Sequence, residues 1–180
     1  MIYVFLADGF EETEAIAPID LLRRSGCKVV TVGIGDSVVT GSHGITFMTD
    51  TIAQEAPLND ELEMIVLPGG MPGTLNLEKS QYVQAAIDFC VKNNKYIGAI
   101  CAAPSILGHK GLLNGRKAVC YEGFETQLEG ALTGTEPVAE DGCFITSRGA
   151  GTAVEFGLKL VEKAVSKAES DRQRNAIMCF

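Results

Sequence analysis

The sequence predicts an α/β fold in which a doubly wound, mostly parallel sheet is sandwiched by helices. Short continuous apolar runs at residues 2–7, 64–67 and 96–100 are typical of strands that are covered on both faces. Segments with helical spacing alternate with these runs, which is the order that a parallel sheet requires. Because ligands bind at the carboxyl ends of such strands, the residues that follow each strand are the candidates for a functional site.

Length and charge fit one domain with neither a nucleic-acid surface nor a membrane segment. No linker-like stretch divides the 180 residues, so we expect a single domain over residues 1–180. The net charge is −8 and no Lys/Arg cluster is present, which argues against nucleic-acid binding through a basic patch. No apolar run reaches membrane-spanning length and the first residues lack a secretion signal, so we expect a cytoplasmic protein without a membrane partner.

The cysteines predict neither a disulfide scaffold nor a zinc site. They show no CxxC pairing and no zinc-like spacing, so free thiols are expected in a reducing compartment. The six are Cys27, Cys90, Cys101, Cys120, Cys143 and Cys179.

A helix is expected at Glu11–Arg24, directly after a central strand at residues 2–7. Asp8 and Glu11 have the spacing of a capping box. Carboxylates in the first turn also suit the helix dipole without any further role. Pro18, however, leaves the carbonyl of Glu14 without its usual donor, which suggests local structure built around Glu14.

Further elements follow in alternation. A strand is expected at residues 27–32, and two short strands at 37–40 and 45–48 form a hairpin with His43 at its tip. We interpret His43 as a solvated loop residue, because nothing near it in sequence orients its ring. After the strand at 64–67, Gly69 and Gly70 form either an ordinary turn or a cradle of outward N–H groups.

The segment around Cys101 is the strongest functional signal from the residues themselves. A helix at residues 80–93 precedes the buried strand at 96–100, and Pro104 fits only the first turn of a following helix. Strand and helix therefore meet at Cys101, as in a nucleophile elbow, where backbone N–H groups favour a thiolate. The alternative is an inert buried cysteine.

The remainder of the chain is expected to contain further short elements and one long helix. These are a short strand at 118–120, a helix at 122–132, a hairpin at 138–146, a flexible turn at 147–152 and a helix at 153–167. In a parallel sheet, Glu14, the glycine pair and Cys101 all follow strands at one edge, which brings a thiol, a carboxyl group and backbone donors together.

Five motifs resemble the ThiJ/PfpI family, and within it the parkinsonism-associated deglycase branch with its bacterial relatives. They are ADGFEETE at residues 7–14, DLLRRSG at 20–26, LPGG at 67–70, AICAAP at 99–104 and TSRGAGT at 146–152. The resemblance covers essentially the whole chain. The resemblance implies a flavodoxin-like fold, a homodimer, no cofactor or metal, Cys101 as the reactive thiol and Glu14 as its carboxyl partner. It also implies that the N–H groups of Gly70 and Ala102 lie near the sulfur.

The resemblance implies a glyoxalase or deglycase that acts on methylglyoxal-type dicarbonyls or their early adducts. Alternatives are a redox-sensing holdase chaperone, acting through oxidation of Cys101, and a cysteine hydrolase or peptidase. Ala102 stands where the peptidase members have His, and Tyr121 where the deglycase branch often has His, so both the peptidase and a Cys-His dyad are less favoured. Accessory candidates are Gly69, Arg24, Tyr121 and His43.

The pairing of Glu14 with Cys101 also predicts a charge state. Burial and repulsion by a neighbouring thiolate raise the pKa of a carboxyl group, while backbone donors lower the pKa of a thiol. We therefore expect Glu14 protonated and Cys101 ionised at neutral pH.

Overall fold

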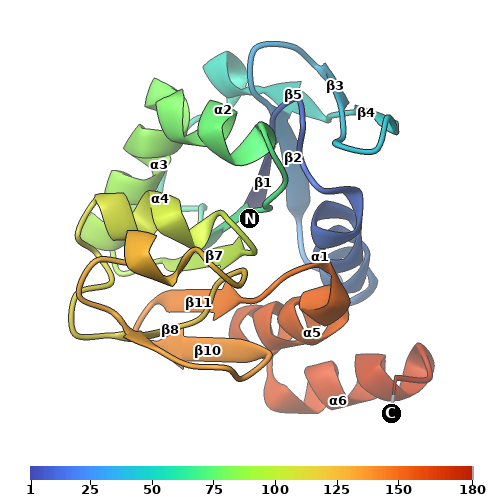
Figure 1. Cartoon of the computed structure of the whole chain (residues 1–180). Helices are drawn as coiled ribbons and strands as arrows, with labels where there is room; N and C mark the ends of the chain where they lie inside the picture. Colours follow the sequence, from blue (N-terminus) through green and yellow to red (C-terminus); the bar gives the residue numbers. More distant parts are fainter. Residues whose placement is uncertain (180) are drawn as a thin grey trace.

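A seven-stranded sheet forms the centre of the protein, as seen in a computed structural model that describes residues 1–179 (Figure 1). The strand order is β10-β11-β7-β6-β1-β2-β5, and only β10 runs antiparallel to its neighbour. This arrangement confirms the predicted α/β fold. The strands are β1 (Ile2–Leu6), β2 (Val29–Gly33), β5 (Thr51–Ile52), β6 (Met64–Leu67), β7 (Tyr96–Ile100), β10 (Val138–Asp141) and β11 (Phe144–Ser147).

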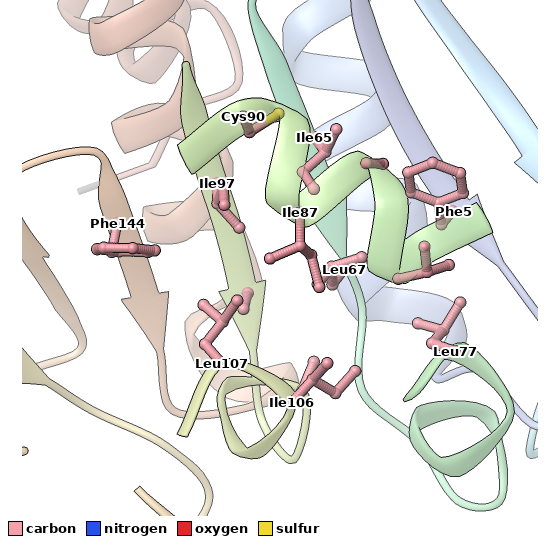
Figure 2. Packing of buried hydrophobic residues seen from close by; sticks show 14 of the residues in the cluster. Phe5, Ile65, Leu67, Leu77, Ile87, Cys90, Ile97, Ile106, Leu107 and Phe144 are labelled. Carbon is pink, nitrogen blue, oxygen red and sulfur yellow. The ribbon is translucent and has the colours of Figure 1, made fainter. Parts of the chain in front are cut away.

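Helices cover both faces of this sheet, which explains the continuous apolar runs. Side chains alternate along a strand, so Tyr3 and Phe5 of β1 enter one core while Ile2, Val4 and Leu6 enter the other. The first core lies under α2 (Gly73–Lys79), α3 (Gln81–Lys92) and α4 (Pro104–His109). The second lies under α1 (Glu12–Arg24) and α5 (Ala153–Ala164). Figure 2 shows the first core, where α3 packs on the sheet.

The first helix begins differently from its prediction. Glu11 is the N-cap of α1, and its Oε2 accepts a 2.7 Å hydrogen bond from the N–H of Glu14. Asp8 instead accepts the N–H of Thr40 at 2.8 Å. This hydrogen bond ties the hairpin of β3 (Val38–Thr40) and β4 (Thr46–Met48) to the end of β1. The side chain of Asp8, which was predicted to cap the helix, therefore makes a tertiary hydrogen bond instead.

Close packing of α1 against α5 surrounds Pro18. A Cβ at Gly157 of α5 would lie 2.7 Å from Cδ1 of Leu21 and 3.1 Å from Cα of Pro18, so the two helices touch where only a glycine fits. Of the apolar residues on several faces of α1, most are buried, and Ile16 is 40% exposed.

The smaller elements confirm some expectations and correct others. The predicted hairpin is present as β3 (Val38–Thr40) and β4 (Thr46–Met48). The helix expected over residues 122–132 is wrong: only a 3-10 turn, η2 (Glu125–Gln127), forms there. Gly123 and Gly130 flank it with φ of +92° and +73°, which an α-helix does not allow. The remaining short elements are β8 (Lys117–Ala118), β9 (Leu132–Thr133), η1 (Ala53–Glu55) and η3 (Ala150–Thr152).

The C-terminal segment forms two helices where one was expected. The first, α5, ends at Ala164 with Val165 as its C-cap. Ser166 caps the second, α6 (Lys167–Ala176), by accepting the N–H of Glu169 at 3.1 Å. Helix α6 packs on α5, and Ile177 and Cys179 pack against the second core, whereas Phe180 lies outside the described residues. Among residues 1–179, no helix has the length and apolar character needed to span a membrane.

Candidate functional site: Cys101 and Glu14

Three chain turns meet at the carboxyl edge of β7, β6 and β1, which are neighbours in the sheet. Cys101 follows β7, Gly69 and Gly70 follow β6, and Glu14 lies in the first turn of α1 after β1. Adjacent parallel strands thus bring together residues that lie up to 87 positions apart, by their numbering. This is the convergence that the alternating pattern predicted.

The backbone of Cys101 adopts a left-handed conformation, with φ of +65°, which is uncommon for a residue other than glycine. Two hydrogen bonds hold it there. The N–H of Cys101 donates to the carbonyl of Ser147 at 2.9 Å, and the N–H of Tyr121 donates to the carbonyl of Cys101 at 2.8 Å. Such a conformation costs on the order of 1–3 kcal/mol and marks functional sites.

The elbow is longer than expected from the sequence. Cys101, Ala102 and Ala103 form a turn, and α4 begins only at Pro104, in the first helical position as predicted. The N–H groups of Ala102 and Gly70 point at the Cys101 sulfur and hydrogen-bond it. The sulfur is therefore surrounded by backbone donors from two different strand ends.

The carboxyl group of Glu14 is the side-chain partner of this sulfur. Glu14 is only 1% exposed, and the thiol of Cys101 donates a hydrogen bond to its carboxyl group. The N–H of Gly69 donates to its Oε2 at 2.9 Å, and the N–H of Ala150 also donates to the carboxyl group. These donors fix the position of a carboxyl group that water does not reach.

Burial raises the pKa of Glu14 to about 7, while its hydrogen bonds with Cys101, Gly69 and Ala150 oppose that shift. The pKa of Cys101 rises to about 12, first through burial and then through the charge of Glu14, against the donors Ala102 and Gly70. The expected rise for Glu14 is present, but the expected lowering for Cys101 is not. Because the pKa of Cys101 lies above that of Glu14, Glu14 loses its proton first and the single negative charge of the pair lies on the carboxyl group. The expected ionised Cys101 at neutral pH is therefore wrong, since burial and the charge of Glu14 both disfavour the thiolate.

Gly69 is required by space at this point. A Cβ on Gly69 would lie 2.6 Å from both the Cβ of Cys101 and Oε2 of Glu14. Gly70 has a φ of +88°, which lets its N–H turn toward the sulfur. Both glycines of the LPGG motif are therefore part of the site geometry, and the cradle interpretation is favoured over an ordinary turn.

The accessory candidates occupy different places. Tyr121 lies beside the site, with its backbone bonded to Cys101 and its side chain 53% exposed. His43 is an exposed residue in the turn of the hairpin, as the sequence interpretation expected, and its Nδ1 lies 2.9 Å from Oε2 of Glu12. Arg24 pairs with Asp20 at the far end of α1, roughly 15 Å along the helix from Glu14 at 1.5 Å per residue, and is not part of the site.

Neither histidine supplies a base for a hydrolytic cysteine. His43 is paired with Glu12, and His109, at the end of α4, is paired with Glu78. Glu11, Glu12 and His43 place potential metal-ligating atoms within 4.8 Å of one another. Their oxygens are already engaged: Glu11 accepts the N–H of Glu14, and Glu12 accepts the N–H of His43 at 2.8 Å. Hydrogen bonds to His43 and Ile45 lower the pKa of Glu12 to about 2 despite its burial.

The loop at residues 147–152, which was expected to be a flexible turn, contributes to the site. Ser147 holds the backbone of Cys101, and Ala150 donates to Glu14. Thr152 fixes this loop, because its hydroxyl donates to the carbonyl of Gly149 at 2.9 Å and lies 2.7 Å from the hydroxyl of Ser147. The high proportion of Ser, Gly and Thr in TSRGAGT was the sequence feature that could have indicated this role.

Comparison with known proteins shows the family to which the chain belongs. The model of the DJ-1/PfpI family matches residues 1–163. Protein dj-1beta of Drosophila melanogaster is 38% identical over 168 residues, covering 91% of this chain and 89% of that protein. The glutathione-independent glyoxalase DJ-1 of Schizosaccharomyces pombe is 33% identical over 174 residues, covering 91% of each. The chain spans only 37% of protein DJ-1 homolog B of Arabidopsis thaliana, to which it is 38% identical over 164 residues.

Solved structures show the same architecture. Oxidized Toxoplasma gondii DJ-1 superposes with a TM-score of 0.93 at 33% identity, over 98% of this chain and 97% of that one. The crystal structure of Drosophila melanogaster DJ-1beta has a TM-score of 0.93 at 33% identity, over 98% of this chain and 96% of that one. With the family model matched over most of its length, this chain belongs to the DJ-1/PfpI family.

Proposed function

We propose that this protein is a Cys101-dependent, cofactor-free glyoxalase or deglycase that acts on methylglyoxal-type dicarbonyls or their early adducts. The observation that carries the proposal is the hydrogen bond between the buried Glu14 carboxyl group and the Cys101 sulfur. It joins a nucleophile to an acid-base group whose pKa is raised to about 7. A similar protein from Schizosaccharomyces pombe is named a glutathione-independent glyoxalase, which supports the same chemistry here.

In the proposed reaction, the Cys101 sulfur adds to the aldehyde carbon and forms a hemithioacetal. The N–H groups of Gly70 and Ala102 already point at the sulfur, so they lie next to an oxygen on the carbon attached to it. Glu14 takes the thiol proton as the sulfur adds and gives it to the hemithioacetal oxygen, so that its carboxylate can then remove the proton from the former aldehyde carbon. It returns that proton to the neighbouring carbon, while the hydroxyl proton passes from the first oxygen to the neighbouring one. The product is a thioester of a 2-hydroxy acid.

Water hydrolyses this thioester, releases the 2-hydroxy acid and restores the thiol. The former aldehyde carbon is oxidised while its neighbour is reduced, so the electrons balance within the substrate. For this reason the sequence of steps needs no external electron acceptor. It requires one group that exchanges a proton near neutral pH, which matches the raised pKa of Glu14.

The test is the conversion of methylglyoxal to lactate by the wild type, Cys101→Ser, Glu14→Gln and the control Cys143→Ser. Cys143 lies between β10 and β11, away from Glu14, and should retain activity after substitution. Cys101→Ser should lose turnover, and Glu14→Gln should reduce it by about 100-fold to 10,000-fold, as expected for loss of a general acid-base group. Lactate formation at the wild-type rate in either site variant would rule out this mechanism.

Redox sensing through Cys101 is the second candidate, because one similar protein was solved in an oxidized form. Backbone N–H groups of Gly70 and Ala102 suit an oxidised, negatively charged sulfur as well as a thiolate. Activity and protection of a client protein from aggregation are measured before and after stoichiometric peroxide. A gain of client protection on oxidation, matched to oxidation of Cys101 by peptide mass, favours sensing over catalysis.

A second copy of this chain is the partner we propose. Exposed apolar side chains are present on α1 and on the β3–β4 hairpin: Ile16, Ile45 and Met48 are all exposed. Glu12 ties the hairpin to α1 through the N–H of His43, so this surface is held as one unit. An apolar surface of this kind is typical of an interface between protein chains.

A further inference from the structure

A pocket of about 380 Å³ lies beside the Cys101–Glu14 pair and is not used by the reaction proposed above. Its lining includes Tyr121, Glu122, Arg148, Gly149 and Thr152. The N–H of Tyr121 donates a hydrogen bond to the carbonyl of Cys101, so one residue that lines the pocket is in direct contact with the residue that carries the thiol. A volume of this size falls within the roughly 300–1,000 Å³ of small-molecule sites.

Gly149 separates this pocket from Glu14. A Cβ on Gly149 would lie 3.4 Å from the Tyr121 ring and 3.8 Å from Oε1 of Glu14. The backbone there is extended, with φ of 163°, so any residue can adopt it. The absence of a side chain at Gly149 is thus not a backbone requirement, and it leaves room for one carbon atom in contact with both the tyrosine ring and the carboxyl group.

The lining selects the chemistry of a ligand. Arg148 only donates hydrogen bonds and Glu122 only accepts them, while the Thr152 hydroxyl does both. Arg148 donates to the carbonyl of Thr135 at 3.4 Å and forms no ion pair within residues 1–179. A hydrocarbon ligand would displace water from these groups without replacing its hydrogen bonds. An anionic ligand would be repelled by the Glu122 carboxylate. Hydroxyl groups, which donate and accept, satisfy both charges, and the Tyr121 ring offers an apolar wall for their carbon chain.

We propose that this pocket binds a hydroxylated chain attached to the dicarbonyl, so that the protein prefers polyhydroxylated α-oxoaldehydes, of the kind derived from sugars, over methylglyoxal. This inference rests on the proposed function for the site of attack. The aldehyde carbon lies at Cys101, and the chain passes over Gly149 into the pocket. The methyl group of methylglyoxal is too short to use these contacts.

The test compares the wild type, Gly149→Ala and Cys143→Ser with two substrates, methylglyoxal and 3-deoxyglucosone, which carries a hydroxylated chain. Gly149→Ala places a methyl group between the Tyr121 ring and Glu14, whereas Cys143 lies between β10 and β11, outside the lining of the pocket. For Gly149→Ala we expect kcat/KM with 3-deoxyglucosone to fall about tenfold more than with methylglyoxal, chiefly through KM. Cys143→Ser should keep the wild-type ratio. An equal fall for both substrates in Gly149→Ala overturns the proposal.

A second readout does not depend on turnover. Each compound is tested for protection of Cys101 against iodoacetamide, followed by peptide mass. In the wild type, 3-deoxyglucosone should protect at a lower concentration than methylglyoxal, and Gly149→Ala should lose this preference. Equal protection by both compounds in the wild type overturns the subsite. Preferential protection without any lactate formation from methylglyoxal would instead support the subsite and contradict the proposed glyoxalase reaction.

Discussion

The N–H of Gly69 donates a 2.9 Å hydrogen bond to Oε2 of Glu14, and the same glycine leaves no space for a side chain between Glu14 and Cys101. Gly69 thus orients the carboxyl group with its backbone N–H. Because Gly69 has no Cβ, Cys101 can also lie close to that carboxyl group. The distance between the carboxyl group and the thiol therefore depends on the turn that follows β6, although neither group belongs to that strand or its turn.

Gly69→Ala should therefore separate Glu14 from Cys101. The added methyl group would overlap both side chains at 2.6 Å, and displacement by about 1 Å is enough to reduce turnover by about 100-fold. The measurement is methylglyoxal turnover beside denaturant unfolding, with Cys143→Ser as the control. Wild-type turnover in a folded Gly69→Ala protein would contradict this account of the site.

Glu14 should make the protein less stable as the pH rises. Its pKa is raised from 4.5 in the unfolded chain to about 7 in the folded protein, so between these values the unfolded chain ionises while the folded protein does not. The free energy of unfolding falls across this window by about 3 kcal/mol at most, at 1.36 kcal/mol per pKa unit. Below pH 4.5 the contribution is complete, and above pH 7 it is lost.

The check is urea unfolding of the wild type and Glu14→Gln at pH 4.5, 6 and 8. Because the glutamine does not titrate, the difference in unfolding free energy between the two proteins should move in favour of Glu14→Gln as the pH rises. Other titrating groups, such as Glu12, are common to both proteins and cancel. A difference that stays constant between pH 4.5 and 8 would show that Glu14 titrates normally.

The reactivity of Cys101 should follow the titration of the pair. In the wild type, alkylation should reflect two coupled ionisations, because charged Glu14 raises the pKa of Cys101. Glu14→Gln removes the charge but keeps a donor, so a single ionisation with a lower thiol pKa is expected. Glu14→Leu removes the donor as well and should give a higher thiol pKa than Glu14→Gln.

Peptide mass is the appropriate readout for this alkylation, since five other cysteines would obscure a bulk signal. A wild-type Cys101 that titrates near the free value of about 8.5, unmoved by either substitution, would exclude the pairing.

The dimer predicted for this chain should depend on the apolar surface of α1 and the hairpin. Met48 is 76% exposed, and Met48→Lys would place a charge in the proposed interface. Sedimentation at micromolar concentration should show twice the 19.1 kDa chain mass for the wild type and a shift toward the single chain for Met48→Lys. Met178→Lys, at an equally exposed residue near the C-terminus, is the control. A wild-type species of 19.1 kDa alone would refute the dimer.

Local physical chemistry in the sequence determined the strands, the main helices and the edge at which they meet. The apolar runs of β1, β6 and β7 required cover on both faces, and Pro104 required a helix start just after Cys101. From these alone, Glu14, Gly69, Gly70 and Cys101 could be expected at one edge of the sheet. The motif resemblance added their roles.

Tertiary structure decided what depends on contacts between distant residues. The positive φ of Cys101 exists because Ser147 and Tyr121 hold its backbone, and neither lies near it in sequence. The rise in the thiol pKa comes from burial, which a sequence pattern does not measure. Asp8 accepts a hydrogen bond from Thr40, and does not cap α1, because the hairpin folds back onto the end of β1. Local patterns fix each element, but the charge and geometry of a site follow from which elements surround it.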